Sequence, residues 1–248
     1  MAEQMQSSWL RRRVEGAIRK AFMRAYDRVK VDPARFLMLL RAAHGLPISS
    51  YQGVFALDLR LLDRVAEDTI GSGMRLAALQ GAGFGLGGLL TLVPDLSLLA
   101  AITLRTIQKL SLVYGFEFST DRELAELWIA AASAAGVDIS RELIEKEVVN
   151  KFVPKVIQRI AAKASGEVVE KWAGRLIPLV SSVIGAALNY YFIRAWGERA
   201  KKYFRAKHLE MRPRMTPLPA TLEAQPAAVI EGQDVLPSST SDGRTLSS

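Results

Sequence analysis

The stretch RLAALQGAGFGLGGLLTLVPDLSLLAAITLRTIQKLSLVYG, residues 75–115, decides the fold class of this chain. Inside it, from residue 76 to residue 104, Asp95 is the only charged side chain. Pro94 divides the stretch, and proline both lacks a backbone N–H and clashes with the preceding helical turn. We therefore expect two apolar helices that meet at a sharp corner. Gly115 is the glycine expected just past the end of the second helix.

Helical periodicity continues towards the amino terminus. Apolar side chains spaced three and four apart between Leu10 and Val29 predict an amphipathic helix with a basic polar face. Asp32-Pro33 predicts the start of a second helix, because Asp can cap it and Pro tolerates its first position. A loop is expected from Gly45 to Gly53. A further helix near residues 54–70 is expected to end at Gly71-Ser72-Gly73.

The carboxyl-terminal half gives similar signals. Ser119 or Thr120 can cap a helix that ends at Gly136, and Ser140 can cap the next helix, which we expect Ser165-Gly166 to end. A last long helix is expected from Pro178 to about Leu209. No segment shows the two-residue alternation of a strand. The sequence predicts an all-α, multi-helix bundle with a glycine-rich apolar helical hairpin.

Composition divides the chain into three parts. We expect basic helices over residues 1–54, the main helical domain over residues 55–209, and a disordered tail rich in Pro, Ser and Thr over residues 210–248. The formal charge of +8 is uneven: residues 1–60 carry 11 basic and 5 acidic side chains, and residues 151–214 carry 14 and 4. Basic helices thus flank a mildly acidic middle.

The residue types exclude several kinds of chemistry. The chain has no cysteine, which excludes thiol catalysis and disulfide frameworks. Its two histidines, His44 and His208, lie far apart in the sequence without acidic neighbours in a ligand pattern, so no metal site is expected. The usual hydrolase, zinc-protease and P-loop motifs do not occur. No cofactor is expected.

Gly83-Phe84-Gly85-Leu86-Gly87-Gly88 formally matches the dinucleotide-binding pattern. That pattern needs a preceding strand and an acidic residue about 20 positions later, whereas here a helix precedes it and Gln108 stands at the later position. Close helix packing is the alternative interpretation, since glycines four apart let two backbones approach. The packing interpretation covers Gly81, Gly83, Gly85, Gly87 and Gly88.

Two uncharged runs raise the question of a membrane. Residues 76–94 form a run of 19 and residues 176–193 a run of 18, against about 20 apolar residues needed to span a bilayer. Aromatic and basic residues follow the second run, as where a helix leaves a bilayer on its cytoplasmic side. Full spanning, shallow insertion and a soluble buried core all remain open. The residues expected at an anionic surface are Arg11, Arg12, Arg13, Trp196, Lys201, Lys202 and Arg205.

A lone carboxylate in an apolar stretch normally requires a polar partner. Asp95 could instead be stabilised by the positive end of its own helix. The sharper hypothesis is a buried pair with Arg105 or Arg75, which Asn189 could complete. The candidate polar cluster comprises Asp95, Arg105, Gln108, Tyr114 and Asn189.

Two blocks of this sequence resemble the EcsC protein family of bacteria. The resemblance covers about residues 55–209 and rests on the glycine-rich run with Asp95, Arg105, Gln108, Tyr114 and Gly115, and on a second block, LIPLVSSVIGAALNYYFIRAWGERAKKYFRAKHL, residues 176–209. Neither block is a catalytic signature. The resemblance implies a bacterial helical protein that is cytoplasmic or peripheral to the membrane.

The expected function is therefore non-enzymatic. We expect a protein that associates with the cytoplasmic face of the inner membrane, or with a membrane protein there, through its basic helices and apolar segments, and that could bind lipid. The first residues lack the apolar core of a secretory signal, which favours a cytoplasmic location. The alternative is a hydrolase-like enzyme with a pocket around Asp95, Arg105 and Asn189. Nucleic acid is not an expected partner, although a pI of 9.8 leaves a third class to consider.

Overall fold

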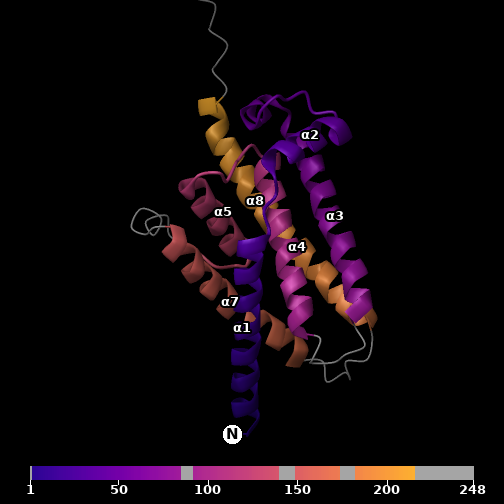
Figure 1. The fold of residues 1–248 in the computed structure, drawn as a ribbon, viewed down its shortest axis with the longest axis vertical. Helices are drawn as coiled ribbons and strands as arrows, with labels where there is room; N and C mark the ends of the chain where they lie inside the picture. Colours follow the sequence, from indigo (N-terminus) through magenta and orange to yellow (C-terminus); the bar gives the residue numbers. More distant parts are fainter. Residues whose placement is uncertain (1, 85–91, 140–148, 174–181, 216–248) are drawn as a thin grey trace, which may run out of the picture. The chain divides into compact units, whose positions relative to one another are not determined.

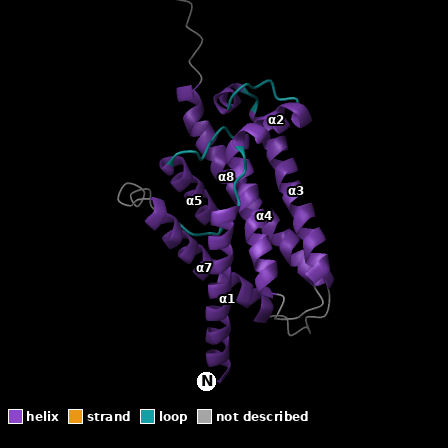
Figure 2. Ribbon diagram, in the orientation of Figure 1, coloured by secondary structure: helices purple, strands orange, loops and turns teal. Residues whose placement is uncertain are grey.

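The computed structural model describes residues 2–84, 92–139, 149–173 and 182–215. These residues form helices joined by short connections, and no strand occurs in the described ranges (Figures 1 and 2). The predicted all-α bundle is confirmed. The helices are α1 (Ala2–Arg28), α2 (Pro33–His44), the 3₁₀ helix η1 (Tyr51–Ala56), α3 (Leu59–Phe84), α4 (Leu92–Val113), α5 (Asp121–Ala134), α7 (Val149–Ala173) and α8 (Ser182–Met215).

Helices α3, α4 and α8 pack along one another (Figure 1). Asp63 near the start of α3 pairs with Arg205 near the end of α8, whereas Gly73 further along α3 contacts Ile193. Helices α3 and α8 are therefore antiparallel. Gly73 also lies against Thr106 of α4, which brings all three helices to one level of the bundle.

Helix α1 joins this group through an apolar stripe. It packs on α4 and α7, and its buried residues recur every three or four positions, as the sequence predicts. Those residues are Val14, Ile18, Ala21, Phe22 and Ala25. All of these helices belong to one compact unit, Met1–Thr216, so residues 1–54 share a core with the helices that follow them.

Most predicted helix ends are confirmed. Asp32 accepts hydrogen bonds from the N–H groups of Ala34 and Arg35 at 2.9 and 3.2 Å, and so caps α2. Thr120, rather than Ser119, caps α5 in a reciprocal capping box with Glu123. Three glycines adopt positive φ just past helices: Gly45 after α2, Gly115 after α4 and Gly136 after α5.

Two predicted helix ends are wrong. Helix α3 continues through Gly71-Ser72-Gly73 to Phe84, and α7 continues through Ser165-Gly166 to Ala173. A Cβ on Gly73 would lie 2.6 Å from Oγ1 of Thr106, so this glycine permits helix contact instead of ending a helix. The hydroxyl of Ser165 donates to the carbonyl oxygen of Ala162 in the preceding turn of α7, so this side chain does not cap a new helix.

Other expectations fall partly outside the described residues. Pro94 lies in the first turn of α4, where its missing N–H costs no helical hydrogen bond. The expected corner of the hairpin, with Gly85, Gly87 and Gly88, and the Ser140 cap lie outside the described residues, and so does the expected tail from residue 216 onward. Gly81 and Gly83 lie in the last turns of α3. Helix α8 continues to Met215, past the predicted boundary at residue 210.

Candidate functional site

The expected polar cluster is spread along α4. Asp95 lies in the first turn of this helix, ten residues and about 15 Å of helix rise before Arg105. Arg105 is exposed, whereas Asn189 in α8 is buried. The Asp95 side chain lies outside the described part of the structure. The described residues therefore give no support to one pocket lined by Arg105 and Asn189.

Gln108 has a structural partner of its own. Its side-chain oxygen accepts the N–H of Val31 at 3.0 Å, and its amide nitrogen donates to the carbonyl oxygen of Val29 at 3.0 Å. Both contacts hold the connection between α1 and α2. The buried amide thus satisfies two backbone groups of a segment that is neither helix nor strand.

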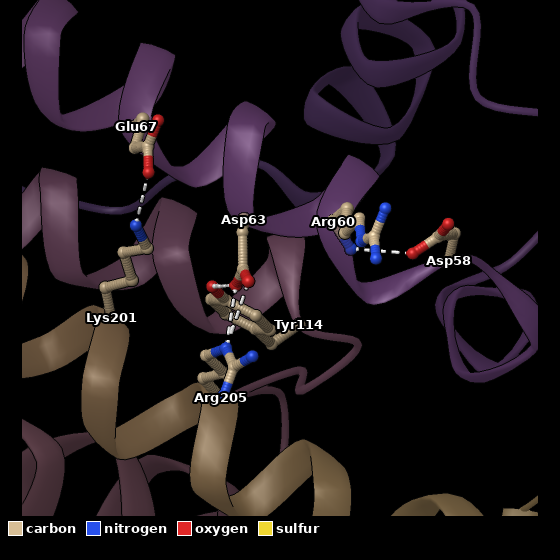
Figure 3. Close-up of polar contacts among 7 residues, drawn as sticks. All are labelled: Asp58, Arg60, Asp63, Glu67, Tyr114, Lys201 and Arg205. Atoms are coloured by element: carbon tan, nitrogen blue, oxygen red, sulfur yellow. Dashed lines mark hydrogen bonds and ion pairs between the residues drawn. The ribbon is translucent and has the colours of Figure 1, made fainter.

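Tyr114 belongs to a different group, which we call the seam cluster: Asp63 of α3, Tyr114 after α4 and Arg205 of α8 (Figure 3). The Tyr114 hydroxyl donates to Oδ1 of Asp63 at 2.7 Å. Nε of Arg205 lies 3.2 Å from Oδ1 and 3.0 Å from Oδ2 of the same carboxylate. Burial, and then the hydrogen bond to Asp63, raise the pKa of Tyr114 far above its ordinary value.

Further ion pairs extend from this cluster along α8. Lys201 binds Glu67 of α3 at 2.7 Å (Figure 3), and Lys207 binds Glu126 of α5 at 2.8 Å. In the same view the carboxylate of Asp58 accepts the backbone N–H of Arg60 and so caps the start of α3. Lys201, Arg205 and Lys207 therefore connect the second half of α8 to α3 and α5.

His208 lies beside the seam cluster and is fully buried, with 0% exposure. Its ring stacks on Phe55 of η1 at 4.7 Å, and Nδ1 lies 2.9 Å from the carbonyl oxygen of Tyr114. Because a carbonyl only accepts, Nδ1 carries the proton and Nε2 is left as an acceptor. Nε2 has no hydrogen-bond partner among the described residues. Burial lowers the pKa of this imidazole.

The chemistry available to the seam cluster is limited. Both oxygens of Asp63 already accept hydrogen bonds, so this carboxylate is not poised as a general base. No group of three or more His, Asp or Glu side chains within the described ranges could hold a metal ion. The geometry is that of a structural connection between three helices. Sequence reasoning missed Asp63 because the pairing depends on helices that are distant in the chain.

The residues expected at an anionic surface separate into two sets. Trp196 is only 2% exposed and stacks on Phe22 of α1 at 5.7 Å, which corrects its expected surface position. Lys201 and Arg205 are held in the ion pairs described above. The exposed members are Arg11, Arg12, Arg13 and Lys202.

Exposed apolar side chains gather where α3 ends and α8 begins. Leu79 is 75% exposed, and Leu76, Tyr190 and Tyr191 are exposed as well. In Figure 1 the end of α3, the starts of α4 and α8 and the amino-terminal part of α1 all lie toward the lower edge. Trp9 of α1 is exposed there, with Arg13 over its ring at 5.2 Å. We call this region the lower end of the bundle.

The lower end carries exposed charge of a single sign. We define its described part as residues 9–20, 71–79, 96–105, 160–166 and 189–194. Every exposed charged side chain in these ranges is basic. They are Arg11, Arg12, Arg13, Arg19, Lys20, Arg75, Arg105, Lys163 and Arg194. Exposed acidic and basic side chains are mixed over the rest of the described bundle. Asp27 is exposed in the last turns of α1, close to Arg24, which donates to Ser97 of α4 at 3.5 Å. Asp58, Arg60, Arg64 and Glu67 are exposed on the first turns of α3.

One helix of the described chain is long and apolar enough to cross a membrane. The window Leu96–Val113 in α4 has a mean hydropathy of 1.4, but 61% of it is buried inside the bundle. Its large side chains, including Leu104, Leu110 and Leu112, lie in the core. The hydropathy of α4 is thus accounted for by its central position.

Comparisons with known proteins extend the resemblance seen in the sequence. The profile of the EcsC protein family matches residues 7–209, and so begins well before residue 55. Protein EcsC of Bacillus subtilis (strain 168) is 27% identical over 160 residues, which cover 62% of this chain and 67% of that protein. The "Uncharacterized protein YdbA" of the same organism is 23% identical over 141 residues, 53% of this chain and 52% of that protein. No solved structure matches the chain.

Proposed function

This chain belongs to the EcsC protein family, and we propose that it associates with the cytoplasmic face of the inner membrane as a peripheral, non-enzymatic protein. The lower end of the bundle would face the lipid. Anionic phospholipid is the partner that fits this region. Full spanning is not part of the proposal, because the helix that is apolar enough to span among the described residues is mostly buried.

The observation that carries the proposal is the composition of the lower end. Exposed leucine and aromatic side chains occur together with exposed charges that are all basic. An exposed apolar patch on a soluble surface is unfavourable, so it usually marks a binding site. A partner that offers both apolar chains and negative charge would satisfy both features. A bilayer with anionic headgroups is such a partner.

The two kinds of side chain would act in different ways. Each Lys or Arg near an anionic surface contributes about 1 kcal/mol of attraction, which decreases with salt. Leu76 and Leu79 would enter the boundary between headgroups and acyl chains. Trp9, Tyr190 and Tyr191 are of the type that prefers the headgroup level, where their rings are apolar and their polar atoms remain hydrated.

Co-sedimentation with vesicles tests the proposal. The full-length protein is mixed at low salt with vesicles of neutral lipid, or of neutral lipid containing anionic phosphatidylglycerol. We expect binding only to the anionic vesicles. Reversing the charge of Arg11, Arg12 and Arg13 to Glu should lower the partition coefficient at least about 100-fold, because the attraction of three cations is lost.

A matched control reverses charge elsewhere on the bundle. Arg60, Arg64 and Arg122 are exposed and lie outside the lower end, so their change to Glu should reduce binding much less. The net charge of the two triple variants is identical. Equal losses in both variants would show attraction by total charge alone and contradict the proposed role of the lower end. Absence of binding to anionic vesicles at low salt would contradict membrane association itself.

A further inference from the structure

The contact between α8 and η1 depends on a buried imidazole. His208 stacks on Phe55 with its ring plane within 4° of parallel, and Arg212 one turn later donates to the carbonyl oxygen of Leu57 at 3.1 Å. These two contacts join the last residues of the segment that contains η1, residues 46–57, to α8. Tyr51, Val54 and Phe55 of this segment are buried, and Phe55 is the one of the three that contacts His208.

The surroundings accept His208 only as a neutral ring. Nδ1 donates to the carbonyl oxygen of Tyr114, and a second proton on Nε2 would have no acceptor among the described residues. The ring stacks on Phe55 and makes an edge contact with the ring of Tyr114, at 6.1 Å between centroids. A charged imidazole with no hydrogen bond for its new proton is strongly disfavoured in such a place.

The charged groups around the ring do not compensate. Arg212 on α8 repels a positive charge on the His208 ring, and Asp63 on α3 attracts it. The carboxylate of Asp63, however, already accepts from Tyr114 and pairs with Arg205. Tyr51 is the titratable group contributed by η1, and it is a neutral hydroxyl that donates to the carbonyl oxygen of Pro33.

The tight fit of Phe55 leaves little room for adjustment. A Cβ on Gly115 would lie 2.8 Å from Cε2 of Phe55, so the turn after α4 closes one side of the ring. Phe116 contacts another side at 5.6 Å between ring centroids. If the imidazole of His208 moves away, Phe55 of η1 therefore loses the ring on which it stacks.

We propose that His208 is an acid-sensitive latch, and that its protonation releases residues 46–57 from α8 and exposes the apolar side chains of η1. The latch is independent of the proposed membrane association. The open state binds one more proton than the closed form, at His208 of α8. Its population relative to the closed form should therefore rise up to about tenfold for each unit by which the pH falls, starting below the ordinary histidine pKa of 6.5.

Hydrogen–deuterium exchange of the full-length protein in solution, without vesicles, tests the latch. Exchange of residues 46–57 is compared at pH 7.5 and pH 5.5 after correction for the intrinsic rates. We expect at least severalfold greater opening of this segment at pH 5.5, with little change in α3 or α4. His208→Asn keeps a donor for the Tyr114 carbonyl but does not titrate, and should remove the difference between the two pH values.

The other histidine supplies the control. His44 lies 3.9 Å from Asp68 at the end of α2, and His44→Asn should keep the response of the wild-type protein. A response that persists in His208→Asn, or that is lost in His44→Asn, would overturn the latch. Equal opening of the wild-type segment at both pH values would do the same.

A second measurement covers the case in which His208→Asn does not fold. The wild-type protein has two imidazoles, and NMR of His44→Asn identifies the signal of His208. We expect this signal to titrate below 6.5 and together with the opening of residues 46–57. An imidazole that titrates in its usual range while η1 stays protected would contradict the proposal.

Discussion

Gly73 and Gly197 show how single residues set the distance between the central helices. A Cβ on Gly73 would collide with Thr106 of α4, and a Cβ on Gly197 would lie 2.9 Å from Cγ1 of Ile70 in α3. Thr106 cannot turn away without loss, because its hydroxyl donates to the carbonyl oxygen of Ile102. Among the described glycines, these two permit close packing between the central helices. Neither belongs to the glycine-rich run that suggested such packing in the sequence.

Replacement of Gly73 tests this role. Gly73→Ala should lower the free energy of unfolding by about 1–3 kcal/mol, because the added methyl group overpacks the contact with α4. Gly16→Ala in α1 is the matched control, since no atom lies within 4 Å of its added Cβ. That change should instead stabilise the protein by about 0.5–1 kcal/mol through higher helix propensity. Urea unfolding measures both, and equal effects would contradict the packing role.

At the scale of elements, the side chain of Gln108 links α4 to the connection between α1 and α2. A short irregular segment joins α1 and α2, and the buried backbone N–H and C=O groups of such a segment need hydrogen-bond partners. Gln108 supplies both a donor and an acceptor from one rigid helix. The amphipathic pattern of α4 does not reveal this link, because the sequence around a single glutamine on an apolar face does not depend on which segment the glutamine contacts.

Gln108→Met keeps the length of the side chain and removes both hydrogen bonds. The N–H of Val31 then loses its partner in a buried position, so we expect a loss of about 2–3 kcal/mol in the free energy of unfolding. Gln158→Met on the exposed face of α7 serves as the control and should change stability by less than about 0.5 kcal/mol. A similar small effect at both positions would show that the link is not needed.

At the scale of the whole molecule, the described bundle separates its surfaces by chemistry. The sequence predicts that α8 is a basic helix, but in the fold some of its cations form ion pairs and others remain exposed. Lys201, Arg205 and Lys207 pair with acidic residues of α3 and α5, whereas Arg194 stays exposed at the lower end. Arg194 therefore adds to the exposed basic side chains beside Leu79, Tyr190 and Tyr191, whereas Lys202 of the same helix is exposed outside the lower end.

Replacement of Leu79 tests the apolar part of this surface. Leu79→Glu should weaken binding to anionic vesicles by at least about tenfold, because an inserted leucine side chain contributes about 1.5–3 kcal/mol and the new charge is repelled. Leu209→Glu, at an exposed leucine near the other end of α8, should weaken binding much less. Unfolding in urea should be unchanged in both variants. Equal weakening in the two variants would argue against insertion of the lower end.

The predicted helix starts and the predicted helix ends differ in how well they agree with the structure, for a physical reason. Helix starts at Pro33 and Asp121 follow from caps within four residues, and these were predicted from the sequence alone. The end expected at Gly71-Ser72-Gly73 was wrong because Gly73 lies against Thr106 of α4 inside a continuous helix. The end expected at Ser165-Gly166 was also wrong, since α7 continues through it. The described residues do not test the Asp95 side chain.

The sequence by itself determined the all-α class, the family, and the helix starts at Pro33 and Asp121, because periodicity and capping act over a few residues along one chain. Only the tertiary structure decided which charges remain exposed, that Trp196 is buried, and that Tyr114 meets Asp63 and His208. These contacts join residues that lie 51 and 94 positions apart. Their existence depends on how the helices pack, and that depends on the whole buried core at once.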